Sequence, residues 1–203
     1  MTLKLKIFIL TMMCGSFLLA SAAYSQDKNG ADKVPATPST AKNVKKDLPE
    51  ITGWEKNGSM DMSDPSEDYI VDYQSESAGR VTVYVYSRGL PAVPDGIKDA
   101  LIIDEFNGAK GAIFQLAEVG IYTDVKEIKN ETVTLGGKPG KIQSLHSNFT
   151  FKAKGTPLVS EIFLFGKQNK FIKIRATRPK DQEASGQSAM DTLLSELDKF
   201  FSN

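Results

Sequence analysis

The feature that most restricts the fold of this chain is a pair of alternating segments joined by a short turn. In residues 69–74 and 81–86, apolar or aromatic side chains occupy every second position: Tyr69, Val71, Tyr73, Val81, Val83 and Val85. The turn between them, residues 76–79, ends in a glycine. Because side chains on a strand point alternately to its two faces, the pattern predicts a β-hairpin with one buried face.

The period changes after a segment that is interrupted by two prolines. Apolar side chains then recur at spacings of four, three, four and three residues: Ile102, Phe106, Ala109, Ile113 and Leu116. This stripe predicts an amphipathic helix from residue 97 to about residue 118. Asp95 is the expected N-cap, and Gly120 is the expected end of the helix.

Strand patterns return in the second half of the chain. We expect strands at residues 121–128, 132–135, 141–154, 158–165 and 171–177. The segment 158–165 is largely apolar on both faces, which is typical of a central strand. Short turns between the late strands predict mainly antiparallel pairing.

A second amphipathic stripe predicts a helix at the end of the chain, with Ser188 as its cap. The stripe consists of Met190, Leu193, Leu194, Leu197, Phe200 and Phe201. The order of elements predicts an α+β fold, in which a mainly antiparallel sheet of about six to seven strands is sandwiched between helices (α/β/α). We expect the two stripes to pack on opposite faces of the sheet.

The first 25 residues have the pattern of a secretion signal. Lys4 and Lys6 precede an uncharged apolar run, residues 7–20, and Ala20-Ser21-Ala22 fits a cleavage site. The run is shorter than the ~20 residues that span a bilayer. We therefore predict a signal peptide at residues 1–25, export to the periplasm or the extracellular space of a bacterium, and no transmembrane segment after cleavage. A retained signal anchor is the alternative.

The residues after this signal predict a linker and then one domain. Residues 26–48 contain no aromatic side chain and few apolar ones, so they cannot form a core, and we predict a flexible linker there. Residues 49–203 are expected to form a single α/β/α sandwich domain. Cys14 is the only cysteine. The bulky Met13 before it disfavours lipidation, and the mature chain has no thiol for a disulfide or a thiolate metal site.

Charge is balanced over the chain and unevenly distributed along it. The sequence has 25 basic and 25 acidic residues, which argues against a nucleic acid partner held by net charge. In residues 141–180, however, nine Lys or Arg stand against one acid, and in residues 47–72 eight acids stand against one base. Such a distribution is typical of a protein with a basic face that attracts an anionic partner.

The late strands supply the candidates for such a basic face. Lys173 and Arg175 alternate with isoleucines and should share one face of their strand, and Lys152 and Lys154 lie in another late strand. We predict that these four residues form a patch for an anionic partner, either an envelope component or an acidic protein. Two alternatives are a helix that covers this face while the charged groups reach its rim, and lysines that merely protect sheet edges.

No segment of the sequence has the residue spacing of a known catalytic or metal-binding motif. His146 is the only histidine, and the chain has no G-x-S-x-G segment. The glycine-rich segment 136–141 departs from the phosphate-binding loop, and the acidic segment 61–68 lacks the spacing of a calcium loop. We predict no catalytic residue, no cofactor and no metal. The alternative is a carboxylate-based hydrolase whose acids are brought together only by the fold.

Four segments, taken in order, resemble a known superfamily. They are Ile51–Trp54, the run Val133–Gly137 before a long strand, the strand Lys170–Arg175 and the closing helix. Together with the hairpin and the mid-chain helix, they resemble the photosystem II extrinsic subunit P, the Ran-binding Mog proteins and the bacterial DcrB-like secreted proteins. The resemblance implies an antiparallel sheet between helices and an accessory or binding role without catalysis. It transfers no functional residue to this chain.

Overall fold

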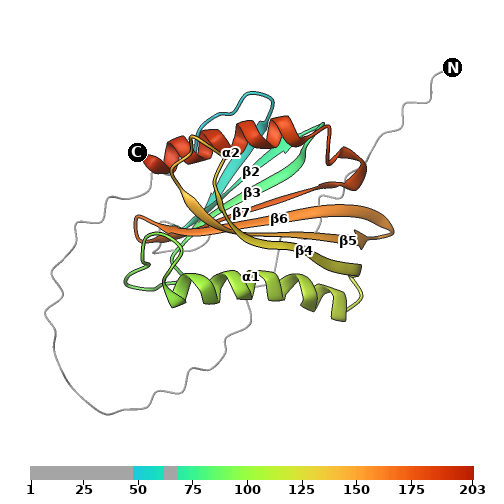
Figure 1. Cartoon of the computed structure of the whole chain (residues 1–203), viewed down its shortest axis with the longest axis horizontal. Helices are drawn as coiled ribbons and strands as arrows, with labels where there is room; N and C mark the ends of the chain where they lie inside the picture. Colours follow the sequence, from blue (N-terminus) through green and yellow to red (C-terminus); the bar gives the residue numbers. More distant parts are fainter. Residues whose placement is uncertain (1–47, 62–67) are drawn as a thin grey trace, which may run out of the picture. The chain divides into compact units, whose positions relative to one another are not determined.

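Seven strands form one antiparallel sheet in the computed structural model, which describes residues 48–61 and 68–203. The strand order is β1-β2-β3-β7-β6-β5-β4, and all described residues belong to one compact unit. The predicted α+β fold is confirmed (Figure 1). The strands are β1 (Glu55–Asp61), β2 (Tyr69–Ser75), β3 (Gly79–Tyr86), β4 (Tyr122–Thr134), β5 (Gln143–Ala153), β6 (Thr156–Lys167) and β7 (Lys170–Pro179).

Two helices and one short 3-10 turn complete the unit: α1 (Ala100–Glu118), η1 (Lys180–Gln182) and α2 (Gln187–Ser202). Asp99, not Asp95, caps α1, because its Oδ1 accepts a hydrogen bond of 2.8 Å from the backbone N–H of Leu101. Asp95 instead accepts a hydrogen bond from the backbone N–H of Gln168, at 2.8 Å. The cap position of α2 is Gly186, so the prediction of Ser188 is wrong by two residues.

The two helical stripes pack on opposite faces of the sheet, as predicted, although Leu116 at the end of the first stripe is only half-buried. The α1 cluster contains Ile102, Phe106, Ile113, Phe149, Phe151, Ile162, Leu164 and Phe171. The α2 cluster contains, among others, Val71, Val83, Phe163, Phe165, Ile172, Ile174, Met190, Leu194, Leu197 and Phe201.

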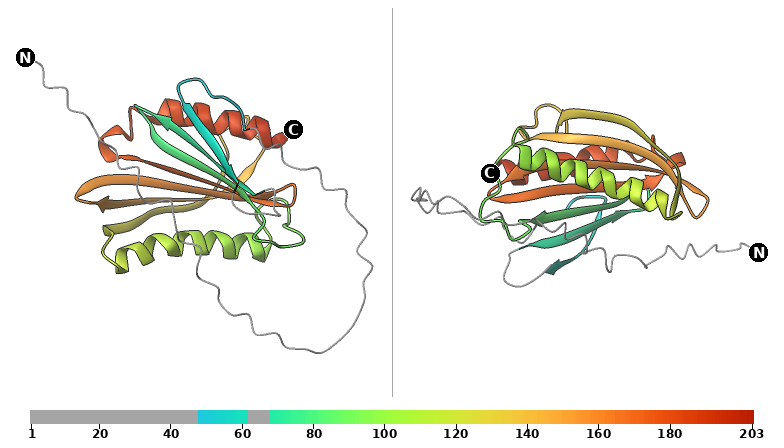
Figure 2. Two further views of the ribbon diagram at one scale, coloured as in Figure 1. Left: turned by 180° about the vertical axis from the view of Figure 1, so that it is seen from behind. Right: turned by 90° about the horizontal axis from the view of Figure 1, so that it is seen from below.

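Each helix covers only part of its face. The α1 cluster includes no residue of β1 or β2, and the α2 cluster includes no residue of β5. In Figures 1 and 2, α1 lies along β4, β5 and β6 on one side, while α2 lies over β2 and β3 on the other. The side of β5 that faces away from α1 is therefore not covered by the apolar side chains of α2.

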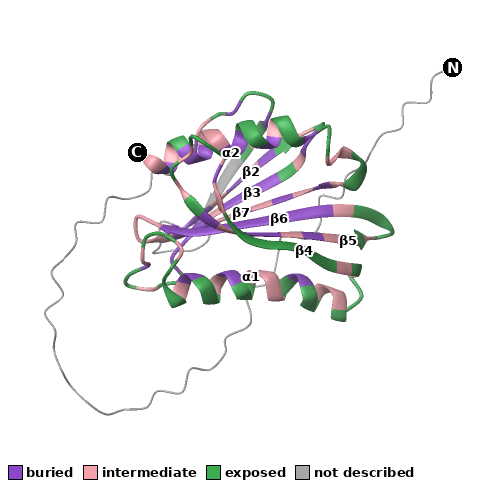
Figure 3. Ribbon diagram, viewed as in Figure 1, coloured by how far each residue is buried: buried purple, intermediate pink, exposed green. Residues whose placement is uncertain are grey.

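Two strands differ from their sequence-based predictions. β1 has no alternating pattern and was not predicted; it pairs only with β2. β4 is one strand of 13 residues with two register shifts, not two separate strands. Figure 3 shows β4 mostly exposed at its edge position, whereas β6 is buried, as expected for the central strand predicted there.

The predicted signal peptide and nearly all of the predicted linker lie outside the described residues. Leu48, at the end of that linker, is buried in the α2 cluster. Within residues 48–61 and 68–203, no helix is both long and apolar enough to cross a membrane.

Candidate anion-binding site

The structure divides the four predicted patch residues between the two faces of the sheet. Lys173 and Arg175 alternate with Ile172 and Ile174 of the α2 cluster, so they lie on the α1 side of β7. Lys152 alternates on β5 with phenylalanines of the α1 cluster and therefore points to the opposite side. Lys154 lies at the tip of the β5–β6 hairpin, with a positive φ of 51°.

Lys173 packs against aromatic rings at the rim of α1. Its Nζ lies 4.5 Å from the ring centroid of Tyr84 and 5.2 Å from that of Tyr86. Burial lowers the pKa of the Lys173 ammonium, and the nearby Glu105 carboxylate on α1 opposes this shift. The cation is held largely by contacts within the protein.

Arg175 is held in a similar way by polar groups on the same face. Its Nη2 donates to the hydroxyl of Tyr122 at 3.3 Å, and its Nε donates to Oγ of Ser160 at 3.4 Å. Both late-strand cations on this side are half-buried. Their surroundings match the alternative of charged side chains packed at the rim of a covering helix better than an open patch.

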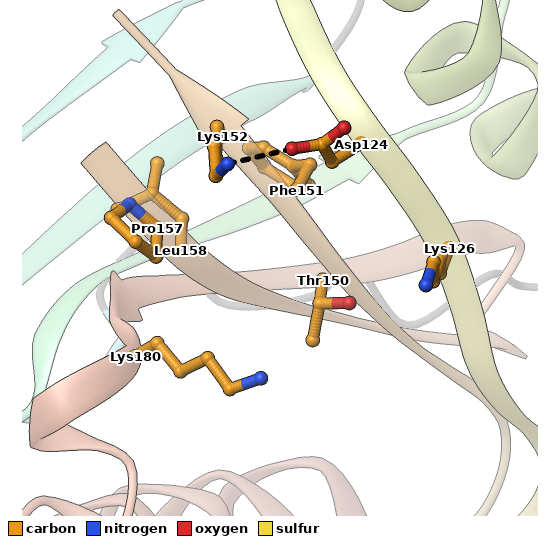
Figure 4. A pocket seen from close by; sticks show the side chains of 8 residues that line it. All are labelled: Asp124, Lys126, Thr150, Phe151, Lys152, Pro157, Leu158 and Lys180. Carbon is orange, nitrogen blue, oxygen red and sulfur yellow. Dashed lines mark ion pairs between the residues drawn. The ribbon is translucent and has the colours of Figure 1, made fainter. Parts of the chain in front are cut away.

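A pocket of about 250 Å³ opens at the end of the sheet where β5 ends and β6 begins. Figure 4 shows Lys126 and Lys180 on opposite sides of this opening, with Thr150 between them. Thr150 lies on the same side of β5 as Lys152, the side that α2 leaves uncovered. The pocket, called the lysine pocket below, is lined by Asp124, Lys126, Thr150, Phe151, Lys152, Pro157, Leu158 and Lys180.

One acid lines the lysine pocket, and it is already paired. The Lys152 ammonium lies 2.8 Å from Oδ2 of Asp124, and this contact lowers the pKa of the Asp124 carboxyl. Lys152 is 47% exposed, so the pair is solvent-screened. Lys126 and Lys180 are exposed and form no ion pair with any described residue. With three lysines and one acid, the lining of the pocket therefore keeps an excess of two positive charges.

Sequence reasoning missed Lys126 as a site residue. It belongs to an edge strand, and its neighbour Thr150 is set by the register of β4 against β5, which shifts between Thr123 and Lys126. No local pattern predicts where such a bulge occurs. Lys180 lies in the predicted basic segment, but only the turn after β7 brings it to the end of β5.

A polar cluster lies further along the same face of the sheet. The His146 ring stacks on Phe163, with centroids 4.5 Å apart. Its Nδ1 lies 3.6 Å from Oε1 of Glu131, and its Nε2 lies 3.7 Å from Oε2 of Glu161. Glu161 also accepts a hydrogen bond of 2.9 Å from Nη2 of Arg178, a residue that is 1% exposed. His146 is thus a buried residue between two carboxylates, consistent with a packing role.

The buried acids of the described residues do not converge on one another. Asp68 pairs with Lys170, whose Nζ is 2.7 Å from Oδ1. Asp198 accepts two backbone hydrogen bonds, from the N–H groups of Lys141 and Ile142. Glu161 is bound by Arg178. Each of these three buried acids thus has its own set of partners.

Within residues 48–61 and 68–203, no group of three or more His, Cys, Asp and Glu side chains could hold a metal ion. The acidic segment 61–68, which lacks the spacing of a calcium loop, lies mostly outside these residues, and Asp68 at its end is buried.

Comparisons with known proteins find matches among solved structures. No protein-family model matches this sequence, and no curated protein does. Among the solved structures that are similar to this chain is the solution structure of cyanobacterial PsbP (CyanoP) from Synechocystis sp. PCC 6803. It has a TM-score of 0.44 and 12% sequence identity, and the match covers 71% of this chain and 81% of that chain. At this level of similarity, nothing about a ligand or partner transfers from one chain to the other.

Proposed function

We propose that this protein is a non-enzymatic accessory or binding protein that docks an anionic partner at one end of its sheet. The docking surface is the sheet-end patch, defined as Lys126, Lys152, Lys154 and Lys180. The observation that carries the proposal is a concave site with lysines from three different elements and a single acid, Asp124. The partner is an anionic component of the cell envelope or an acidic protein.

The proposal places the protein outside the cytoplasm of a bacterium. The support is the signal-like pattern of residues 1–25, in which two lysines precede an uncharged apolar run. We also infer distant membership of the superfamily of the photosystem II extrinsic subunit P and the DcrB-like proteins. The support for it is the order of elements, with one helix on each face of an antiparallel sheet.

The sheet-end patch makes a stronger candidate than the Lys173–Arg175 pair for a physical reason. Lys126, Lys154 and Lys180 are exposed and form no ion pair with a described residue. Their charges are therefore free to attract an anion over about one Debye length, ~8–10 Å near physiological salt. Lys173 and Arg175 are already engaged by aromatic rings and hydroxyl groups, and moving them would break those contacts.

Binding to anionic probes tests this proposal. The protein is produced by export in a bacterial host, and its intact mass should show a chain that starts at Ala23 or Gln26. We expect it to bind phosphatidylglycerol vesicles or polyglutamate, and to bind several-fold more weakly when salt rises from about 0.05 M to about 0.5 M. A chain that keeps Met1 would contradict the cleavage of a signal peptide. Absence of binding to both probes at low salt would contradict the binding function.

Matched variants locate the surface. The double variant Lys152→Gln, Lys154→Gln should bind several-fold more weakly and remain folded. The control Lys98→Gln, Lys138→Gln removes the same charge from exposed positions outside the patch and should bind as the unmodified protein does. Loss of binding in a Lys173→Gln, Arg175→Gln variant instead would move the docking surface to the α1 face.

A further inference from the structure

The lysine pocket presents donors in an arrangement that discriminates among anions. Two ammonium groups, from Lys126 and Lys180, flank the opening, and the Thr150 hydroxyl lies between them (Figure 4). Each ammonium group can donate three hydrogen bonds, and the hydroxyl can donate one. Lys152 lies on the same rim, where its charge is shared with Asp124 at 2.8 Å. The site is thus rich in donors and positive charge from several directions.

The chemistry of common anions can be compared with this arrangement. A phosphate monoester carries a charge of about −1.5 to −2 near neutral pH and has three strong acceptor oxygens. Its charge matches that of the two lysines, and its oxygens can accept hydrogen bonds from ammonium and hydroxyl groups alike. A carboxylate carries only one negative charge, so it compensates one of the two lysine charges and leaves the other without a counter-charge. Lysine is a common phosphate ligand because its ammonium acts as a mobile point charge.

The size of the pocket points in the same direction. Its volume of about 250 Å³ admits a small group and not a folded protein surface. Its walls also include Pro157 and Leu158, which give the ammonium groups an apolar boundary on one side. An anion inside the pocket is therefore less hydrated on that side than it would be on an open surface. A phosphate group that enters the pocket gains from both features.

We infer that the lysine pocket binds a phosphoryl group, with Lys126, Lys180 and Thr150 as its ligands. This inference rests on the proposed binding function and narrows the anionic partner to one that bears phosphate. Lys152 adds charge at the rim through its pair with Asp124. The phosphoryl group belongs either to a soluble phosphate ester or to the headgroup of an envelope lipid.

Titration with small anions, followed by NMR of the backbone amides, tests the inference. Inorganic phosphate and glycerol 3-phosphate should shift the amide signals of residues 124–126, 150–152 and 180. Acetate and chloride at the same ionic strength should shift them much less. Equal shifts with acetate or chloride would show charge screening only and would overturn the inference. Phosphate shifts confined to another region would overturn it as well.

Variants separate the pocket from general charge effects. Lys126→Gln with Lys180→Gln should weaken phosphate binding at least about tenfold, because it removes two charge-assisted hydrogen bonds. Thr150→Val removes only the hydroxyl and should weaken binding by a smaller factor. The charge-matched control Lys98→Gln, Lys138→Gln should bind phosphate normally. Equal weakening in this control and in the pocket variant would overturn the assignment.

Two further comparisons identify the source of the phosphate. They also show whether a negative result contradicts the phosphoryl inference alone or the proposed function as well. If glycerol 3-phosphate binds as tightly as phosphatidic acid vesicles do, the ligand is a soluble ester, whereas pocket-dependent binding to the vesicles alone assigns it to a lipid headgroup. Binding to polyglutamate, without any phosphate-dependent shift and without pocket-dependent binding to phosphatidic acid vesicles, overturns only the phosphoryl inference. Failure of every probe overturns the proposed function too.

Discussion

At the scale of single residues, Arg178 is the least exposed charged residue of the part of the chain that the structure describes. It is 1% exposed, and its Nη2 donates to Glu161 at 2.9 Å and to Gln187 at 3.3 Å. Its Nε and Nη1 have no hydrogen-bond partner among the described residues. A buried cation of this kind depends on its carboxylate, because removal of one partner leaves an uncompensated charge.

The pKa of Glu161 reflects this dependence. Burial alone would raise it, but the adjacent His146 imidazole and the Arg178 charge outweigh burial and hold it below its usual value of 4.5. The folded protein therefore binds fewer protons at this group than the unfolded chain does. The resulting stabilisation is complete above about pH 4.5 and is lost as the pH falls through the folded-state pKa.

We predict that Glu161→Gln lowers the free energy of unfolding at pH 7 by about 3 kcal/mol, the usual cost of breaking a buried ion pair. The difference from the unmodified protein should shrink as the pH falls below about 4.5, because a protonated glutamate resembles glutamine. Urea unfolding at a series of pH values measures both effects. Glu131→Gln is the control: this residue lies beside the same imidazole but is 46% exposed, and it should cost less than about 1 kcal/mol. A pH-independent difference for Glu161→Gln would contradict the prediction.

At the scale of elements, the two helices and most strands could be predicted because the period of their apolar residues matches their burial. The sequence could not predict which face of each strand packs against which helix. β5 turns its phenylalanines toward α1, whereas β7 turns its isoleucines toward α2. Both sets are apolar, and nothing local assigns either set to a helix. Lys152 and Lys173 therefore lie on opposite faces of the sheet, although the sequence predicted that they form one patch.

β1 was not predicted, because apolar and polar residues do not alternate along it.

The β4–β5 hairpin is joined to α2 by a close backbone approach. A Cβ atom on Gly136 would lie 2.6 Å from Cα of Ser195 in α2, and the φ of this glycine is +69°. Asp198 of α2 also accepts hydrogen bonds from the backbone N–H groups of Lys141 and Ile142, at 2.9 and 2.7 Å. The glycine-rich segment is thus a docking turn and not a phosphate loop.

This approach gives a matched pair of glycine variants. Gly137 has a similar φ of +73°, but a Cβ atom there would meet nothing within 4 Å. We predict that Gly137→Ala costs about 1–2 kcal/mol, the strain of the left-handed backbone alone. Gly136→Ala should cost clearly more, because α2 or the hairpin must also shift. Thermal unfolding of both variants measures the difference. Equal losses would contradict the docking role of Gly136.

At the scale of the whole described unit, partial coverage by the helices explains why the charged residues are distributed as they are. α1 and α2 cover different halves of the two faces, so each face keeps a half without an apolar helix above it. On the α2 side, that half carries His146, Glu161 and the lysine pocket. Composition predicted a basic region, but only the diagonal arrangement of the helices determines which of its lysines remain open.

The core of the folded domain extends to the segment before β1. Leu48, Ile51 and Trp54 are all buried in the α2 cluster, although they precede the first strand. The Trp54 Nε1–H donates to the backbone carbonyl of Ala189 in α2 at 3.1 Å. The Tyr73 hydroxyl donates to the carbonyl of Pro49 at 2.8 Å. This segment therefore belongs to the domain energetically, whereas the predicted linker before it supplies no aromatic side chain.

We predict that a chain that starts at Leu48 unfolds at the same temperature as a chain that starts at Gln26. A chain that starts at Glu55 should be strongly destabilised, because it loses three buried apolar side chains. Trp54→Ala alone should cost about 3–5 kcal/mol, the usual loss for a buried aromatic side chain. Since such domains are stable by only about 5–15 kcal/mol, the chain that starts at Glu55 should be partly or wholly unfolded at 37 °C. Circular dichroism melting of these four proteins measures the differences. Destabilisation of the chain that starts at Leu48 would show instead that residues 26–47 form part of the folded domain.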